Sequence, residues 1–305
     1  MKSFRQSRRE MMTNTARVVA GLSLAGGCRP STCRQSKVKS CGGGFKIGTC
    51  DWTFGKMAEV SAFKDAKRYG VDGLQIDFGS AEDALPLRKK EVQQKYLEAL
   101  KGGKMEIASL AMVGLGWTPY KSDPRWELWA GDGIRTAKAM DVEIVLLAFF
   151  GEEELSTDAE GRKIVTRKLK RLAPEAERAG VVIGLESWMS AEQNMEVIDN
   201  VGSPAVQVYY DVGNSAKKGY DIYKEIRYLG RENICQFHAK DYGGMFGEGA
   251  IDFERVRGAM DDIGYRGWIL FEDTSWAPKE AVTAEQAAKF KKNIAYLRKI
   301  FPRRA

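Results

Sequence analysis

Residues 181–211 read VVIGLESWMSAEQNMEVIDNVGSPAVQVYYD. An almost continuous apolar run at 181–186 is followed by an amphipathic stretch at 191–201, a glycine, and a second apolar run at 206–211. Continuous apolar runs are typical of parallel strands that are covered on both faces, and a glycine behind an amphipathic stretch is a common end for a helix. The stretch therefore predicts a strand–helix–strand unit of a parallel α/β fold.

The same unit recurs along the rest of the chain. Eight strand candidates lie at 45–50, 73–77, 105–110, 143–150, 181–186, 206–211, 234–238 and 268–272. Amphipathic stretches lie between or behind them, at 60–70, 92–103, 166–180, 191–201, 253–264 and 284–300. Pro124 suits the first turn of a further helix, with Ser122 or Asp123 as its cap. Eight such units in about 260 residues predict an α/β (β/α)8 TIM barrel. A doubly wound sheet is the alternative, but no GxGxxG follows the first strand candidate.

Four of the predicted strands end in residues of the types that commonly bind metal ions. Glu186, Asp211 and Glu272 end the fifth, sixth and eighth candidates, and the seventh ends in His238, the one histidine of the chain. The carboxyl ends of barrel strands all lie at one face, where catalytic residues collect. Three carboxylates and an imidazole form a mainly oxygen donor set that suits Mn²⁺, Mg²⁺ or a similar divalent ion. The alternatives are a buried structural histidine and an ion with a purely structural role.

The basic character of the chain comes from its first 44 residues. The net charge is +7, yet residues 1–44 hold nine lysines and arginines against one acid, which leaves 39 basic and 40 acidic residues for 45–305. A near-neutral body gives no electrostatic footprint for nucleic acid. We therefore expect a signal and linker segment at 1–44 and one catalytic barrel domain at 45–305.

The first segment carries an export pattern. Arg8 and Arg9 form a twin-arginine pair, and a modestly apolar stretch follows at 16–27. This pattern predicts a twin-arginine signal and a periplasmic location, and the apolar stretch is too short to span a bilayer. A basic tail on a cytosolic protein is the alternative. Cys28 only loosely resembles a site of lipid attachment.

Five motifs distinguish the chain beyond its strand pattern: LES at 185–187, YYDVGN at 209–214, FHAKD at 237–241, GEGAIDF at 247–253 and GYRGWILFED at 264–273. With these motifs, residues 45–300 resemble the sugar isomerase/epimerase superfamily of xylose isomerase-like barrels, which includes ketose 3-epimerases, hydroxypyruvate isomerase and inosose dehydratase. The resemblance implies that one divalent ion is bound by four residues spaced 25, 27 and 34 apart: Glu186, Asp211, His238 and Glu272. Mn²⁺ is the expected ion, with Mg²⁺, Co²⁺ or Zn²⁺ as alternatives.

The resemblance also implies a metal-dependent sugar isomerase or epimerase. An ion that chelates a carbonyl and an adjacent hydroxyl acidifies the neighbouring C–H bond. Glu186 and Glu272 are then the acid–base pair that removes one proton and returns another through an enediolate. The expected partner is a small sugar or keto-sugar, neither a nucleic acid nor a membrane span is expected, and a homo-oligomer stays open. The phosphoesterases of the endonuclease IV type need three metals and several histidines, so the single histidine excludes them.

Two positions depart from the ketose 3-epimerase pattern. Asn214 stands where those enzymes carry a histidine that contacts substrate, and Gly244 stands where they carry an arginine. Two alternatives therefore remain open. One is a keto-sugar dehydratase or keto-glycoside lyase that uses the same acidified C–H bond. The other is a non-catalytic exported barrel that binds carbohydrate.

Further residues at predicted strand ends or in the following loops are candidates for binding substrate. They are Asp51, Trp52, Asp77, Trp188, Glu192, Asn214, Lys240 and Asp241. Phe78 and Trp117 extend the set, because aromatic rings above a sugar site stack on the apolar face of the sugar ring. Each aromatic residue has packing in the core or at the rim as its alternative. Glycines at 243, 244, 247 and 249 predict either a lid or a permissive turn after the seventh strand.

Overall fold

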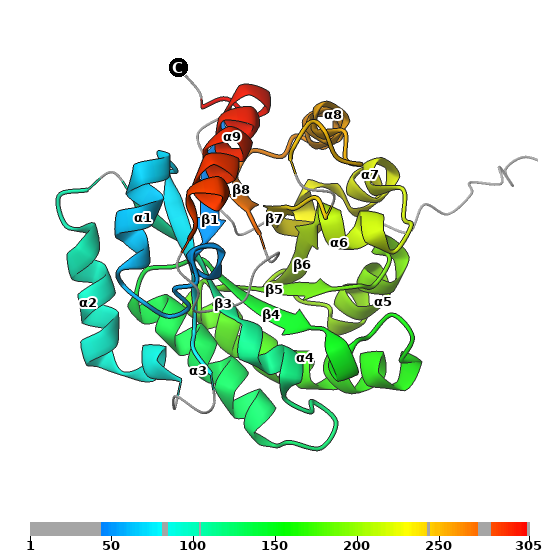
Figure 1. The fold of residues 1–305 in the computed structure, drawn as a ribbon. Coiled ribbons are helices and arrows are strands. Elements are labelled where there is room, and N and C mark those ends of the chain that lie inside the picture. The colour runs from blue at the N-terminus through cyan, green and yellow to red at the C-terminus, as the bar shows by residue number, and fades with distance from the viewer. Residues whose placement is uncertain (1–43, 81–84, 104, 243–244, 274–281, 304–305) are drawn as a thin grey trace, which may run out of the picture. The chain divides into compact units, whose positions relative to one another are not determined.

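Eight parallel strands close into a barrel in the computed structural model, which describes residues 44–80, 85–103, 105–242, 245–273 and 282–303. Each strand pairs with the next, and the last pairs with the first (Figure 1). The strands are β1 (Lys46–Cys50), β2 (Gly73–Asp77), β3 (Glu106–Met112), β4 (Ile144–Phe149), β5 (Val182–Ser187), β6 (Val206–Asp211), β7 (Ile234–Ala239) and β8 (Trp268–Phe271). The predicted TIM barrel is confirmed. The twin-arginine pair, Cys28, Gly243 and Gly244 lie outside the described residues.

The strands form where the sequence has continuous apolar runs. β2, β4, β6 and β7 are buried along their whole length. Such burial follows from a barrel in which helices cover the outer face and the other strands cover the inner face. The predicted strand bounds agree with the structure within two residues at each end.

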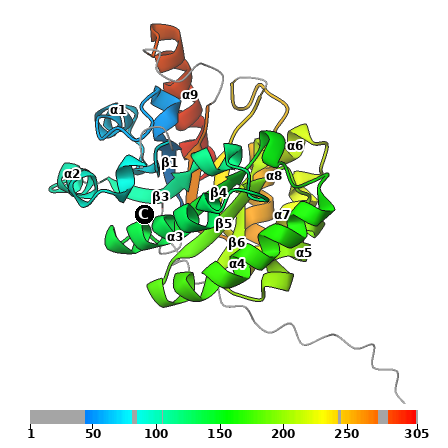
Figure 2. The ribbon, with the colours of Figure 1, turned by 90° about the horizontal axis from the view of Figure 1, so that it is seen from below.

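Helices surround the barrel in chain order (Figure 1). They are α1 (Ala62–Tyr69), α2 (Lys90–Leu100), α3 (Arg125–Ala139), α4 (Ala159–Ala179), α5 (Ala191–Val201), α6 (Val212–Lys217), α7 (Ile222–Asn233), α8 (Phe253–Asp262) and α9 (Ala284–Ile300). α9 lies beside α1 and β1, as Figures 1 and 2 both show, so the last helix covers the seam between the first and last strands.

The starts of several helices follow from local hydrogen bonding. Ser190 and Thr283 each form a capping box with a glutamine three residues later, and so begin α5 and α9. Pro124 directly precedes α3, one position earlier than predicted, and the Asp123 carboxylate accepts a hydrogen bond from the backbone N–H of Arg125 at 2.8 Å. α6 and α7 were not among the predicted helices.

The seam between β1 and β8 is tightly packed. A Cβ atom added to Gly48 would lie 2.3 Å from Leu270 Cδ2 and 3.0 Å from the backbone carbonyl oxygen of Gly73, so a larger residue would require these neighbours to shift. The Thr49 hydroxyl donates a hydrogen bond across the seam to the carbonyl of Phe271 at 2.8 Å. The barrel is thereby closed directly below its C-terminal face, where β1 and β8 end.

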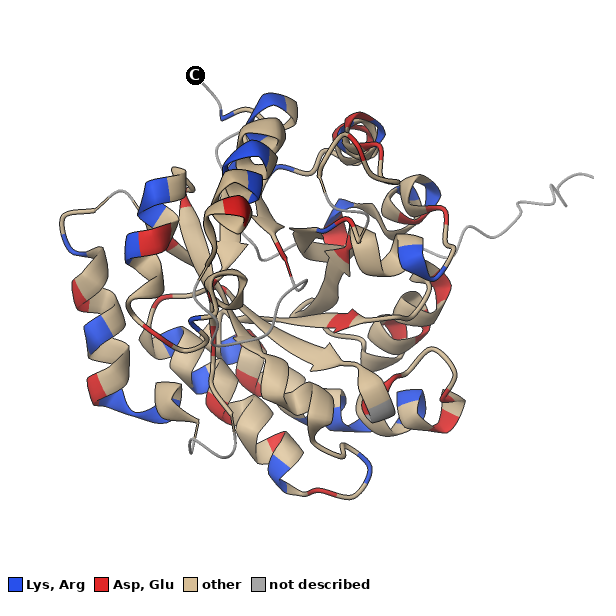
Figure 3. Ribbon diagram, viewed as in Figure 1, with Lys and Arg blue, Asp and Glu red and all other residues tan. Residues whose placement is uncertain are grey.

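Charged residues of both signs are interspersed on the outer helices, as Figure 3 shows. This agrees with the near-neutral charge of residues 45–305. Within the described part of the chain, no helix is both long enough and apolar enough to cross a bilayer.

Candidate metal centre

Four residues from neighbouring strands converge at the C-terminal face of the barrel. Glu186 lies at the end of β5, Asp211 ends β6, His238 lies in β7, and Glu272 directly follows β8. One ligand atom from each of them lies within 4.8 Å of every other, and all four residues are buried. The four residues predicted to bind the metal are therefore brought together, at the face where a barrel carries its active site.

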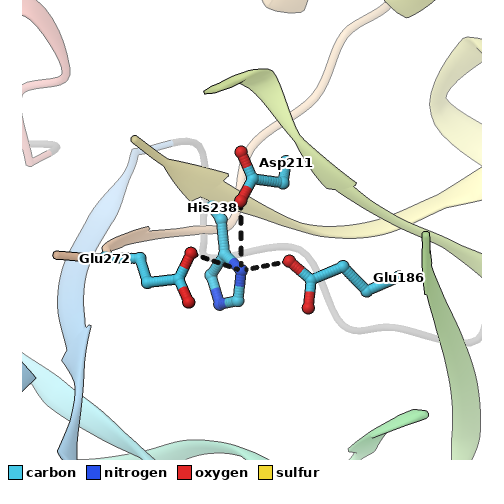
Figure 4. Close-up of side chains that lie close together, drawn as sticks. All are labelled: Glu186, Asp211, His238 and Glu272. Atoms are coloured by element: carbon cyan, nitrogen blue, oxygen red, sulfur yellow. Dashed lines mark hydrogen bonds and ion pairs between the residues drawn. The ribbon is translucent and has the colours of Figure 1, made fainter. Parts of the chain in front are cut away.

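The imidazole of His238 lies at the centre of this cluster. Figure 4 shows its ring with Glu186 on one side, Glu272 on the other and Asp211 above. His238 Nδ1 is 2.8 Å from Glu186 Oε1, 3.8 Å from Glu272 Oε2 and 3.9 Å from Asp211 Oδ2. Burial opposes the charged form of the ring, but the nearby carboxylates outweigh it and raise the pKa of His238.

A buried glutamine orients the His238 ring. His238 Nε2 lies 2.7 Å from Gln75 Oε1, and since an amide oxygen only accepts, Nε2 carries the hydrogen. The Gln75 amide nitrogen in turn donates to the hydroxyls of Ser109 and Tyr209, at 2.9 and 3.1 Å. In the neutral ring Nδ1 would then present its lone pair to Glu186 Oε1, another acceptor, so the 2.8 Å contact requires a proton or a cation. Such an outer hydrogen bond is the usual means of fixing a metal-binding histidine.

Both carboxylate oxygens of Glu272 are held by donors. Lys240 Nζ is 2.8 Å from Oε2, and the indole N–H of Trp52 donates to Oε1 at 3.0 Å. Burial alone would raise the pKa of Glu272, but Lys240 and His238 overcome that effect and lower it to about 2. Glu272 is therefore a carboxylate at neutral pH.

One carboxylate oxygen of Asp211 accepts a hydrogen bond, and the other accepts none. Its Oδ1 accepts the backbone N–H of Asn214 at 2.9 Å and so caps α6, while Oδ2 is buried with no hydrogen-bond partner among the described residues. Burial raises the pKa of Asp211 to about 7, against the lowering effect of Lys240. A buried carboxylate oxygen that has no hydrogen bond and lies 3.9 Å from an imidazole nitrogen is in the environment that a divalent cation satisfies. The donor set therefore fits one divalent ion held by the four residues.

The glycine of the YYDVGN motif, Gly213, is required by the close packing around it. α6 begins directly behind Asp211 and passes close to the chain that follows β7. A Cβ atom on Gly213 would lie 2.7 Å from the carbonyl oxygen of Lys240. Glycine at this position lets the helix and Lys240 approach the same carboxylate.

A cavity of about 340 Å³ adjoins the cluster. Its lining includes both predicted acid–base residues, Glu186 and Glu272. The other lining residues are Trp52, Met57, Val113, Trp117, Ala148, Phe150, Trp188, Asn214, Lys240, Tyr242 and Asp273. This volume lies within the range of about 300–1,000 Å³ that is typical of pockets for small ligands.

Half of the eight predicted substrate-binding residues line the cavity: Trp52, Trp188, Asn214 and Lys240. Asn214 accepts a hydrogen bond through its amide oxygen from the hydroxyl of Tyr242 at 2.5 Å. The Trp188 ring packs against Phe150 with their centroids 5.6 Å apart. These residues are placed where a bound molecule would meet them.

The other four do not line the cavity among the described residues. Asp51 and Asp77 are buried, and their carboxylates accept backbone N–H groups: Asp51 those of Ala58 and Asp77, and Asp77 that of Gly79. Tight turns behind β1 and β2 thus bind Oδ2 of each carboxylate, while Oδ1 of each is buried with no hydrogen-bond partner among the described residues.

Glu192 and Asp241 are placed away from the cavity by their helices and loops. Glu192 is exposed in the first turn of α5 and accepts the Ser190 hydroxyl at 2.8 Å. Asp241 accepts the backbone N–H of Ile251 at 3.1 Å. Phe78, named as an aromatic candidate, is buried in the hydrophobic core.

Because the pKa of the buried Asp77 carboxyl is raised, we expect the stability of the protein to depend on pH. Burial raises its pKa to about 7, so between about pH 4 and pH 7 the folded chain binds a proton that the unfolded chain has released. The free energy of unfolding therefore falls as the pH rises through this window. Asp77→Asn keeps an acceptor for Gly79, and we expect it to flatten this slope and to stabilise the protein at pH 8 by on the order of 1 kcal/mol or more. Urea denaturation of both proteins in EDTA across this window measures the difference, and identical slopes would contradict the assignment.

Sequence analysis did not identify Gln75, Phe150 or Tyr242. A signal existed for Gln75, because an amide in the middle of a continuous buried strand needs a partner. Phe150 and Tyr242 follow strands β4 and β7 as ordinary aromatic residues, and only the path of their loops brings them to the cavity.

Comparisons with known proteins agree with this architecture. A family model described as "Xylose isomerase-like TIM barrel" matches residues 63–300. The chain is 26% identical over 242 residues to L-ribulose-5-phosphate 3-epimerase UlaE of Escherichia coli K12, covering 73% of this chain and 84% of that protein. It is also 26% identical over 272 residues to the putative L-ribulose-5-phosphate 3-epimerase SgbU of the same strain, covering 80% and 84%.

Solved structures share the fold at lower identity. D-psicose 3-epimerase with D-tagatose, from Clostridium cellulolyticum H10, superposes with a TM-score of 0.71 at 14% identity, covering 85% of this chain and all of that one. The 3-keto-D-glucoside 4-epimerase YcjR from E. coli superposes with a TM-score of 0.66 at 17% identity, covering 84% and 99%.

Proposed function

The chain belongs to the xylose isomerase-like TIM barrel family, and on this basis we propose that it is a divalent-metal-dependent sugar epimerase or isomerase. The observation that carries the proposal is the cluster of Glu186, Asp211, His238 and Glu272 beside a cavity that both glutamates line. The similarity to two proteins named as 3-epimerases supports the same class of reaction.

The four clustered residues would hold the ion, and Mn²⁺ is our proposed ion. A bound divalent ion polarises a carbonyl and an adjacent hydroxyl and so acidifies the C–H bond beside the carbonyl. The three carboxylates supply negative charge to hold it, and Gln75 keeps the His238 lone pair directed into the cluster.

The two glutamates are the proposed acid–base pair. They lie on opposite sides of the His238 ring (Figure 4), which suits the removal of a proton from one face of a carbon and its return to the other. Glu272 is ionised and takes the proton from carbon, which leaves the sugar as an enediolate. Glu186, which starts this direction protonated, delivers its proton to the opposite face and is left as a carboxylate. Proton exchange with solvent then resets the pair, and the two carboxyl groups exchange roles in the reverse direction.

Solvent exchange tests this proposal. The purified protein is stripped with EDTA, reloaded with Mn²⁺, and incubated in D₂O with D-fructose, D-tagatose and L-ribulose. We expect deuterium to enter the position beside the carbonyl of at least one ketose, to stop entering after metal removal, and to enter again with Mn²⁺. A stoichiometrically loaded protein that exchanges neither these ketoses nor their glycosides would favour the non-catalytic carbohydrate-binding barrel.

Position 214 is an asparagine and not the histidine of ketose 3-epimerases, so elimination remains a second candidate for the reaction. A dehydratase or a keto-glycoside lyase begins by removing the same proton and then expels a hydroxyl or an alcohol from the adjacent carbon. Proton NMR of the products separates the two reactions, because elimination creates an alkene or its tautomer and epimerisation does not.

Export through the twin-arginine segment remains our proposal for the location of the protein.

A further inference from the structure

The cavity beside the metal centre has two chemically different sides. Glu186, Glu272, Lys240 and Asn214 supply polar groups at or beside the metal cluster, and Trp52, Met57, Tyr242 and Asp273 line the cavity from behind β1, β7 and β8. The other side is apolar and comes from the end of β4 and the segments that follow β3, β4 and β5. We call this second side the aromatic wall and define it as Val113, Trp117, Ala148, Phe150 and Trp188.

We propose that the aromatic wall is a second subsite, which binds a glycosyl ring attached to the reacting sugar. The preferred substrate is then an uncharged ketose disaccharide or related glycoside, rather than a free or phosphorylated monosaccharide. This inference rests on the proposed function, because it takes the reacting sugar to lie at the metal centre.

The exposure of Trp117 is the first argument. Its side chain is 68% exposed at the end of the 3₁₀ turn Val113–Trp117, although it lines the cavity. A large aromatic ring left in water loses the free energy that burial would give. Trp117 combines this exposure with a place in the cavity lining, where a bound molecule would cover it. A sugar ring covers an indole well, since its C–H face is apolar while its hydroxyls remain in solvent.

The packing of the wall is the second argument. Phe150 and Trp188 support each other at a centroid distance of 5.6 Å with their planes inclined by 55°. The ammonium of Lys218 lies over the Trp188 ring, 5.3 Å from its centroid. The wall is therefore built of mutually supported rings and does not need a ligand to form.

The charge of the lining argues against a phosphate group. Three acidic side chains line the cavity, those of Glu186, Glu272 and Asp273, against one lining cation, Lys240. Three further lysines are engaged close by: Lys289 pairs with Asp273 at 3.1 Å, and Lys217 and Lys218 lie over the rings of Tyr242 and Trp188. The Lys240 ammonium lies 2.8 Å from Glu272 Oε2 and 3.8 Å from Asp211 Oδ2. A divalent ion brings this lining close to neutrality, which suits an uncharged glycosyl group better than a dianion.

Binding measurements test the subsite. The probes are D-fructose, D-fructose 6-phosphate, and three glycosyl-fructoses that differ in linkage: lactulose, palatinose and turanose. Isothermal titration of the Mn²⁺-loaded protein is expected to show at least one glycosyl-fructose binding about tenfold more tightly than D-fructose. Trp117→Ala should remove most of this difference. Tyr228→Ala, which truncates another exposed aromatic side chain on α7, should retain it.

Two results would overturn the inference: no glycosyl-fructose binding more tightly than D-fructose, or D-fructose 6-phosphate binding best. A Trp117→Ala variant that keeps the full preference would overturn it as well. Solvent exchange is measured separately on the same sugars. Tight binding of a disaccharide without exchange would refute the proposed reaction and keep the subsite, whereas exchange into D-fructose without a disaccharide preference would do the reverse.

Discussion

Replacement of Glu272 by glutamine is expected to slow deuterium exchange into a ketose by a factor of about 10²–10⁴. The amide is nearly the same size as the carboxyl group, and its one oxygen can still accept a hydrogen bond from either Trp52 or Lys240, which bond to different oxygens of Glu272. It cannot accept a proton from carbon, and it removes the negative charge that faces Lys240 at 2.8 Å. The chemical step should therefore fail while the fold persists.

The effect on Glu272 must be separated from loss of the metal. Mn²⁺ content is measured on the same samples, and exchange rates are compared at saturating Mn²⁺. Glu98→Gln is the matched control, because Glu98 is exposed on α2 and should lose no activity. A Glu272→Gln variant that binds Mn²⁺ and exchanges at the wild-type rate would rule out the base role.

Replacement of His238 by alanine is expected to weaken Mn²⁺ binding at least about 100-fold, since loss of an outer hydrogen bond alone typically costs 10- to 100-fold. His238 is fully buried and is the single imidazole of the chain, so no neighbouring residue can supply the same nitrogen. Its loss also leaves Gln75 Oε1 without its imidazole donor and removes the partner that lies 2.8 Å from Glu186.

Thermal unfolding provides the measurement for His238. A ligand that binds only the folded state stabilises it by about 2.7 kcal/mol at a concentration of 100 Kd. Calorimetry should show a Tm that rises with Mn²⁺ for the wild type and no longer rises for His238→Ala. Cys235→Ala, a truncation of a buried side chain in the same strand, should lower Tm but keep its response to Mn²⁺. Equal responses in wild type and His238→Ala would exclude His238 as a ligand.

Most of the fold could be predicted from the sequence because its strongest signal is local. β2 and β6 are buried at every position, and the bounds predicted from their apolar runs agree with the structure at both ends. The placement of Glu186, Asp211, His238 and Glu272 followed from the same signal, since each stands where an apolar run ends. α6 is too short, at six residues, to show helical periodicity.

The rest of the site depends on contacts between distant residues. Asp51 stands at a strand end as Asp211 does, yet the turn behind β1 directs its carboxylate to the backbone of Ala58 and Asp77. Gln75 reaches His238 only through the register of the closed barrel, across 163 positions of sequence. No local pattern distinguishes a carboxylate that caps a turn from one that faces a cavity.

The seam between β1 and β8 has a consequence for the order of folding. Trp52 reaches Glu272 across 220 positions of sequence, and Thr49 reaches Phe271 across 222. Contacts of such high sequence separation form late, because the entropy of closing a long loop must be overcome before they contribute. During synthesis, the indole of Trp52 can donate to Glu272 only after the last strand has left the ribosome. The four ligands come from β5–β8, but Trp52 and Gln75, which hold Glu272 and His238, come from the N-terminal strands. The fully oriented set of ligands therefore belongs to the closed ring.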